Sequence, residues 1–255
     1  MGIENLSEIE ITIGICDTIF VIISLIIGIK MLSKYIKLKR RFFLTAALAW
    51  ILLSVTWWGG VLSFFLYIMF EKKLNYILIL ILNNATVAFA LMLWIYTICL
   101  VIYPERKKII LSIFLIICIS YEILLLILIF ISPNMVATIS GTYFIKPQLF
   151  VIVFKLFAVI TLLITGIIFS KKSLKSKDPE IQWKARFLSL AFISFFISIF
   201  EVLYVGVFFE SVSILTIIVI IVFRIFLISS VFEYYLGFFL PDKIAKWLIK
   251  EKEKI

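Results

Sequence analysis

The chain has 255 residues, of which 64% are hydrophobic and only 16% are charged, and its net charge is +10 with no histidine. A soluble chain is about 45–50% apolar and about 25% charged, so this composition excludes a soluble domain and indicates an integral membrane protein. The basic residues lie between apolar segments, where they orient the chain in a membrane. The lipid bilayer is therefore the expected partner, and nucleic acid is not.

Seven apolar segments follow one another along the chain, and each is long enough to cross a hydrocarbon core, which takes roughly 20 apolar residues. We expect them at 11–32, 42–69, 75–102, 109–132, 148–170, 185–209 and 212–239. None of the five prolines interrupts an apolar segment, so each segment is expected to be an unbroken helix. The predicted fold is an all-α, single-domain bundle of seven transmembrane helices.

Basic residues alternate between the connections. The first, third and fifth connections and the tail together hold twenty Lys and Arg, whereas the second, fourth and sixth connections hold three. Lys and Arg are enriched on the cytoplasmic side of membrane proteins. The N-terminus is therefore predicted outside and the C-terminus inside, in a multi-pass protein of the cell membrane.

Two local patterns predict helix ends. Asp178-Pro179-Glu180 is typical of an N-cap, a first helical residue and an acidic first turn at the start of the sixth helix. The tail, 241–255, places Ile244, Trp247 and Leu248 near one face and most of its lysines on the other. This pattern predicts a short amphipathic helix on the cytoplasmic membrane surface.

Polar residues within the apolar segments provide the candidate site. Small and hydroxyl residues at helical spacing are typical of faces that pack against other helices. A charge at the bilayer centre costs about 2.5–3.5 kcal/mol and needs a partner, a cavity or a function. From a rise of about 1.5 Å per residue, most of these charges are expected in the outer half of the bundle. We predict that an outward-opening pocket there binds a ligand through Asp17, Trp57, Asn83, Glu122, Lys155, Glu201 and Arg224. A buried ion-pair network without a ligand is the alternative.

Arg224 is predicted to pair with Glu201. Helical side chains lean toward the N-terminus of their own helix. The sixth and seventh helices run in opposite directions and share a short connection, so the two side chains lean toward each other. Glu122 is the rival partner of Arg224, and Lys155 could join the same network.

Enzyme chemistry is not expected. The chain has no histidine, no HExxH motif, no Cys/His nucleophile pair and no phosphate-binding loop. We therefore predict no catalytic residue, no metal ligand and no cofactor.

A resemblance to known proteins lies in the last third of the chain. It is carried by residues 179–188, PEIQWKARFL, and by 224–230, RIFLISS, which run into 234–241, YYLGFFLP. These stretches are similar to prokaryotic, including archaeal, seven-helix membrane proteins of unknown function, which look like the sensor regions that precede histidine kinases. The sequence differs from sensor kinases in ending at Ile255 without an effector domain.

Three functions follow from these patterns. The first is a sensor or receptor-like protein that binds a small molecule from outside and contacts a cytoplasmic or membrane protein partner. The second is a transporter or ion-translocating protein that uses the buried carboxylates, although unbroken helices weigh against it. The third is an accessory subunit whose charges pair with another membrane protein.

Overall fold

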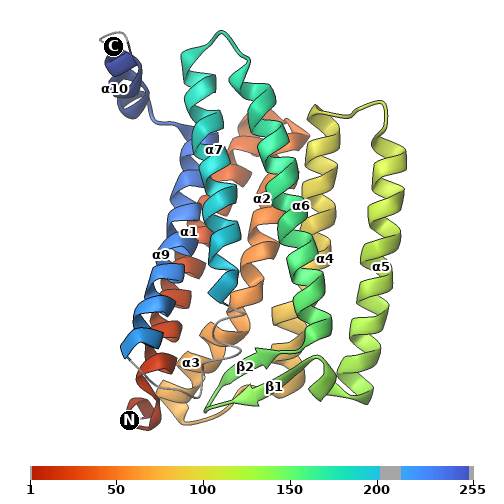
Figure 1. Ribbon diagram of the computed structural model, residues 1–255, viewed down its shortest axis with the longest axis vertical. Helices are drawn as coiled ribbons and strands as arrows, with labels where there is room; N and C mark the ends of the chain where they lie inside the picture. The colour runs from red at the N-terminus through yellow and green to blue at the C-terminus, as the bar shows by residue number, and fades with distance from the viewer. Residues whose placement is uncertain (1, 202–213, 253–255) are drawn as a thin grey trace.

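The computed structural model describes residues 2–201 and 214–252. Most of them form long helices that run along the bundle axis, as Figure 1 shows. The α-helices are α1 Glu8–Leu38, α2 Arg41–Ser54, α3 Trp58–Phe70, α4 Tyr76–Val101, α5 Lys107–Ile131, α6 Leu149–Leu174, α7 Pro179–Ser198, α9 Ile214–Phe239 and α10 Asp242–Lys252. Three short 3-10 helices are η1 Gly2–Asn5, η2 Val55–Trp57 and η3 Pro133–Met135.

Within the described residues, six helical stretches are long and apolar enough to cross a membrane, with α2 and α3 taken as one. The prediction of an all-α, multi-pass membrane protein is confirmed to this extent. The helix α7 is not among the six, and its first half carries Lys184 and Arg186. It accounts for part of the predicted segment 185–209, of which 202–209 lie outside the described residues.

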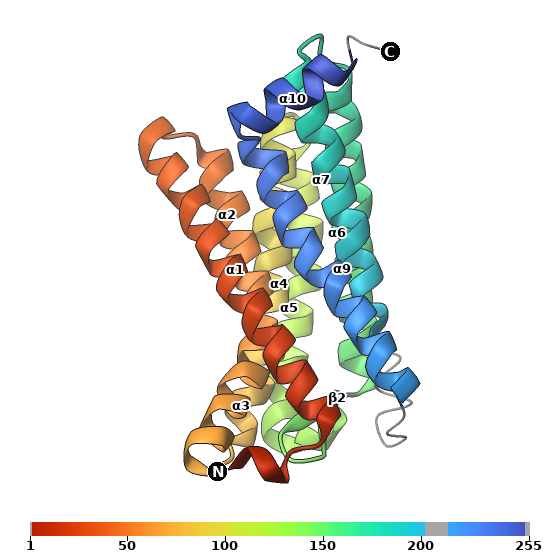
Figure 2. The same ribbon diagram turned by 90° about the vertical axis from the view of Figure 1, so that its left-hand side faces the viewer.

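The helices form a closed ring. α1 packs against α2, α2 against α4, α4 against α6, α6 against α7, α7 against α9, and α9 against α1. α5 packs mainly against α4 and lies at the right-hand edge of the bundle in Figure 1, behind the other helices in Figure 2. Residues on α5 therefore have no direct access to the interior of the ring.

The second apolar segment is broken, contrary to the prediction of an unbroken helix. The helix α2 ends at Ser54, η2 follows, and α3 begins at Trp58. The Ser54 hydroxyl donates to the Ile51 carbonyl at 2.7 Å, and the Thr56 hydroxyl donates to the Leu53 carbonyl at 2.8 Å. Hydroxyl groups that bond backward in this way compete with the α-helical pattern, and here the turn tightens to 3-10 geometry.

A β-hairpin, which the sequence analysis did not predict, lies at one end of the bundle (Figure 1). Its strands are β1 Ala137–Ser140 and β2 Phe144–Pro147, which pair antiparallel. The turn between them contains Gly141 at φ 76°, a conformation that glycine adopts without steric cost. The Tyr76 hydroxyl, at the start of α4, donates to the Ala137 carbonyl and ties the hairpin to the ring.

Side-chain caps explain two helix starts. Ser7 and Glu10 form a capping box, so α1 begins earlier than the predicted residue 11. At α7 the Asp178 carboxylate accepts from the Glu180 amide at 2.8 Å, which confirms the predicted cap.

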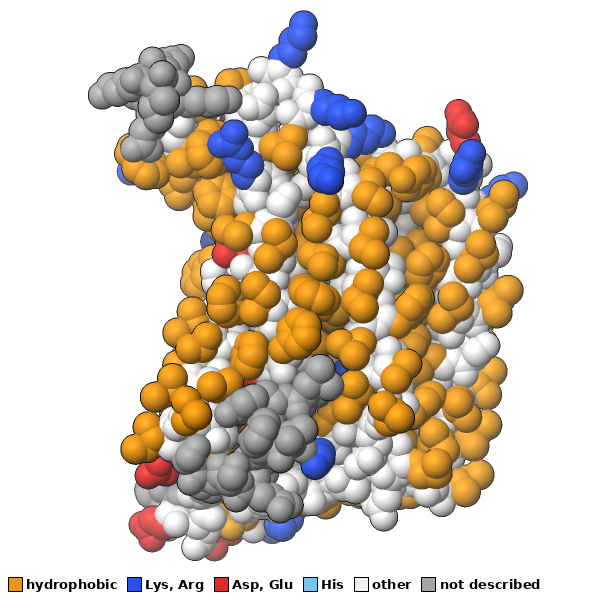
Figure 3. Space-filling model, in the orientation of Figure 1, with side chains coloured by type: hydrophobic (Ala, Val, Ile, Leu, Met, Phe, Trp, Pro, Cys, Tyr) orange, Lys and Arg blue, Asp and Glu red, His pale blue; other side chains and the backbone are white. Residues whose placement is uncertain are grey.

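The predicted tail helix is present as α10, but its apolar residues do not share one environment. Leu248 is buried against a group formed by α7, α9 and α10, whose other members include Trp183, Phe187 and Leu236. Trp247 is 62% exposed and Ile244 is 36% exposed. Leu248, together with Leu240 and Ala245, therefore holds α10 to the bundle, whereas Ile244 and Trp247 remain exposed. Lys and Arg side chains gather at this end of the molecule over an otherwise apolar surface (Figure 3).

Candidate functional site

Three charged side chains meet in the interior of the ring. Arg224 on α9 donates through Nε to Glu201 Oε1 at 2.9 Å, and its Nη2 lies 2.8 Å from the same oxygen. Its Nη1 donates to Asp17 Oδ1 on α1. All three side chains are 7% exposed. The guanidinium thus links carboxylates from two neighbouring parts of the ring.

The predicted pair of Arg224 with Glu201 is confirmed, and Asp17 is a second partner that the sequence analysis did not assign. Asp17 comes within reach because α9 packs against α1, which closes the ring. Neither Glu122 nor Lys155 forms an ion pair with the network among the described residues. The prediction that either could join it is wrong for this structure.

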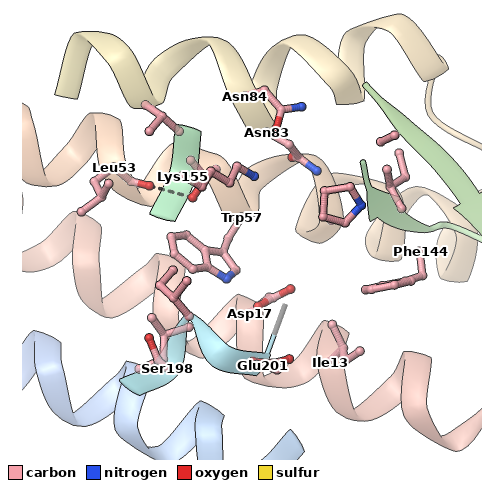
Figure 4. Close-up of a pocket in the computed structure, with 18 of the residues that line it drawn as sticks. Ile13, Asp17, Leu53, Trp57, Asn83, Asn84, Phe144, Lys155, Ser198 and Glu201 are labelled. Carbon is pink, nitrogen blue, oxygen red and sulfur yellow. Dashed lines mark hydrogen bonds between the residues drawn. The ribbon is translucent and has the colours of Figure 1, made fainter. Parts of the chain in front are cut away.

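A cavity of about 150 Å³ lies beside this network. Its walls come from every member of the ring and from the hairpin, whereas α5 contributes no lining residue among those described. Figure 4 shows Lys155, Asn83 and Asn84 on one side and Asp17 and Glu201 on the other, with Trp57 between them. The lining residues are Ile13, Asp17, Leu53, Thr56, Trp57, Gly60, Ile79, Asn83, Asn84, Val87, Ala137, Tyr143, Phe144, Ile145, Pro147, Lys155, Val159, Phe195, Ser198, Ile199, Glu201, Arg224 and Leu227.

The helix break places Trp57 at the cavity. The indole ring lies 4.7 Å from the Phe20 ring and 6.2 Å from the Phe195 ring, measured between centroids. Asn83 on α4 fits against Gly59 at the start of α3, where a Cβ atom would lie 2.1 Å from Asn83 Oδ1. A side chain at position 59 would displace this amide, so the close approach requires glycine.

Lys155 is the second cation that lines the cavity, beside Arg224. The structure gives its ammonium no hydrogen bond and no ion pair within residues 2–201 and 214–252. A charged group away from water is unfavourable unless it is paired and hydrogen-bonded. The Lys155 ammonium therefore offers three donors to whatever occupies the cavity.

Asn84 is a lining residue that the sequence analysis missed. Its Nδ2 donates to the Leu80 carbonyl of its own helix at 2.8 Å, while its Oδ1 has no partner. Asn83 Oδ1 is likewise buried without a partner. The available signal was the presence of two adjacent asparagines in an apolar helix, since each amide needs polar partners inside the membrane.

The hairpin lies against the cavity and is attached to the start of α1. Glu10 Oε1 accepts from the Thr142 amide at 2.6 Å and from the Tyr143 amide at 3.4 Å. The Tyr143 hydroxyl donates to the Glu10 carbonyl at 2.5 Å. Burial raises the pKa of the Tyr143 phenol, so this hydroxyl remains a donor over the whole physiological pH range.

Glu122 does not line the cavity, although it was predicted to bind the ligand with the other six residues. It lies on α5, outside the ring, and its Oε1 is buried without a partner. The sequence gives depth along a helix but not the position of that helix in the bundle. Six of the seven predicted residues, Asp17, Trp57, Asn83, Lys155, Glu201 and Arg224, line one cavity.

The arrangement suits reversible binding of a small polar molecule. It combines a cation, two unpartnered amide oxygens, a carboxylate–guanidinium network and aromatic walls. Among the described residues, no group of His, Cys, Asp and Glu is placed to hold a metal ion. Comparisons with protein-family models, curated proteins and solved structures gave no match to this chain.

Proposed function

We propose that this chain is a sensor or receptor-like protein of the cell membrane, which binds a small polar molecule in the cavity of its helical ring. The observation that carries the proposal is the Lys155 ammonium, which faces a cavity of about 150 Å³ without a partner among the described residues. The side chains of Asn83 and Asn84 lie on the same side, and their buried oxygens have no partner among the described residues. A cavity lined by apolar groups and a few convergent polar groups is the usual form of a small-molecule site.

The proposal includes seven membrane crossings, with the N-terminus outside. The ring and α5 together supply seven helical stretches, of which α7 is the least apolar. The Lys- and Arg-rich connections lie at the end opposite the hairpin. By the enrichment of basic residues in the cytoplasm, the hairpin and the cavity then face the outside. The sensor role also agrees with the resemblance of residues 179–188, 224–230 and 234–241 to sensor regions. The helix α10 and the basic connections offer a surface to a cytoplasmic partner.

A transporter is the second candidate, and the helix break supports it. Transporters often bind substrate where a membrane helix is interrupted. Here η2 interrupts the segment from Arg41 to Phe70, and Thr56 and Trp57 from that turn line the cavity. Uptake of a bound compound into proteoliposomes would distinguish transport from sensing.

An accessory-subunit role has less structural support than the other two functions. Asp17, Glu201 and Arg224 pair with one another, so these charges need no second membrane protein. Glu122 on α5 would remain as the charge for an external partner. A stoichiometric membrane protein retained in mild detergent would support this role.

The test is mass spectrometry of small molecules that co-purify with the full-length protein in mild detergent. We expect a compound that is retained by the wild type and lost from Lys155→Met. The matched control is Lys172→Met on the same helix, because Lys172 is exposed and its ammonium bonds the Val101 carbonyl. If all three proteins retain the same small molecules in equal amounts, the proposal is wrong.

A further inference from the structure

The charges around the cavity are separated onto two sides. On the side of α1 and α9, the carboxyl groups of Asp17 and Glu201 share one guanidinium. When both carboxyl groups are ionised, this side carries one negative charge in excess. On the opposite side, Lys155 contributes one positive charge that has no partner in the described chain. In these charge states the side chains of Asp17, Glu201, Arg224 and Lys155 carry no net charge together. Lys155 nevertheless forms no ion pair with Asp17 or Glu201.

The side of Asp17 also has an open hydrogen-bonding position. Arg224 engages Asp17 through Oδ1, and a Cβ atom at Gly60 would lie 3.5 Å from Asp17 Oδ2. Because Gly60 has no side chain, this second oxygen remains reachable from the cavity. Across the cavity, Asn84 Nδ2 donates to the Leu80 carbonyl and Asn84 Oδ1 is fully buried, so Lys155 is the hydrogen-bonding group that this side offers.

Charge balance selects the ligand class. A ligand with a carboxylate alone would pair with Lys155 and leave the excess negative charge at Asp17 and Glu201. A ligand with an ammonium alone would leave Lys155 unpaired. An uncompensated charge in a low-dielectric interior is costly. A ligand that carries both groups satisfies both sides and adds no net charge.

The size and the walls of the cavity limit the rest of the ligand. An apolar cavity of about 150 Å³ accommodates a molecule of the size of benzene. Phe144, Phe195 and Trp57 supply aromatic surface to this cavity. This space suits a compact molecule with a small apolar body between or beside its charged groups.

We propose, on the basis of the proposed function, that the ligand is a small zwitterion of the amino-acid class. Its carboxylate binds Lys155, and its ammonium group binds the Asp17–Arg224–Glu201 network through Asp17 Oδ2. Phe195 and Trp57 contact its apolar body.

The experiment measures dissociation constants by calorimetry on the full-length protein in detergent. The probes are L-alanine, L-valine, L-phenylalanine and 4-aminobutanoate. Each is compared with the analogue that lacks the ammonium group and with the analogue that lacks the carboxylate, such as 3-methylbutanoate and isobutylamine for L-valine. We expect at least one zwitterion to bind at least tenfold more tightly than both of its analogues.

The variants assign this preference to the cavity. Lys155→Met is expected to weaken zwitterion binding at least tenfold, whereas Lys172→Met leaves it within twofold. If circular dichroism shows that Lys155→Met has lost helix content, Lys155→Gln, which keeps a polar side chain, replaces it in the binding measurement. Equal binding of a zwitterion and its carboxylate-only analogue, or unchanged binding by both Lys155 variants, would overturn the inference.

Failure of this inference differs from failure of the proposed function. If no zwitterion binds but another small molecule is retained in a manner that depends on Lys155, the inference is wrong and the binding function stands. If no probe binds and the retained small molecules do not depend on Lys155, both are wrong.

Discussion

Arg224 determines the local chemistry of the interior because it bonds carboxylates on two sides. Its pairing with Glu201 followed from the direction in which helical side chains lean and from the short connection between the sixth and seventh helices. Its pairing with Asp17 did not, because a sequence gives no information on which helix closes the ring against the last one. The pair that sequence could predict is the pair between consecutive helices.

Removal of Arg224 should destabilise the protein more than removal of either carboxylate. Breaking a buried pair typically costs about 3–5 kcal/mol, because the other charge is left unpaired. Arg224→Met leaves two carboxylates, whereas Glu201→Gln leaves the guanidinium one partner, Asp17. We expect thermal unfolding in detergent to show the larger loss for Arg224→Met.

Combination of the changes should recover stability. The triple variant Asp17→Asn, Glu201→Gln and Arg224→Met removes every charge of the network, so we expect it to melt well above Arg224→Met alone. Strictly additive losses across this series would contradict a shared network.

Lys155 should behave in the opposite way. An unpaired cation in an apolar setting lowers the stability of the folded protein. Residues that are retained for binding often lower stability in this way. We expect Lys155→Met to raise the melting temperature of the ligand-free protein, while Lys172→Met leaves it almost unchanged. A lower melting temperature for Lys155→Met would mean that Lys155 has a structural partner.

Among the elements, the helix break and the hairpin position the cavity, and both were missed from sequence. The break has no proline; its signals are Ser54, Thr56 and the pair Gly59-Gly60, and helices bend at such residues. The hairpin is marked by Gly141 between runs that contain Thr138, Ile139 and Ile145. Its short strands were not distinguished from a polar connection, because each strand has only four residues.

The hairpin depends on Glu10 for its attachment to α1. Glu10→Ala would leave the Thr142 and Tyr143 amides without their acceptor, and an unsatisfied buried group costs about 1–3 kcal/mol. We expect hydrogen exchange at these amides to become roughly tenfold to a hundredfold faster.

The control for the hairpin is Glu8→Ala. Glu8 carries the same charge in the same helical turn but is exposed, and among the described residues its carboxylate forms no hydrogen bond or ion pair with the hairpin. Exchange in the hairpin should not change in this variant. Equal acceleration in both variants would assign the effect to α1 rather than to the Glu10 contact.

At the scale of the whole molecule, the basic end and the cavity lie at different ends of one bundle. The alternation of Lys and Arg between connections could be read from sequence, and the connections rich in them meet at the end opposite the hairpin. The position of α5 outside the ring could not be read, because apolar periodicity does not separate a peripheral helix from an inner one. This is why six predicted site residues meet and Glu122 does not.

The central claim is that the cavity opens to the outside of the cell. It is tested most directly by the reactivity of Thr56→Cys, in a chain whose Cys16, Cys99 and Cys118 are replaced by Ala, toward a charged, membrane-impermeant thiol reagent. The control is Lys177→Cys, an exposed position in the basic connection between α6 and α7. In intact cells we expect labelling of Thr56→Cys and labelling of Lys177→Cys only after permeabilisation. Labelling of Lys177→Cys in intact cells, with Thr56→Cys labelled only after permeabilisation, would contradict the claim.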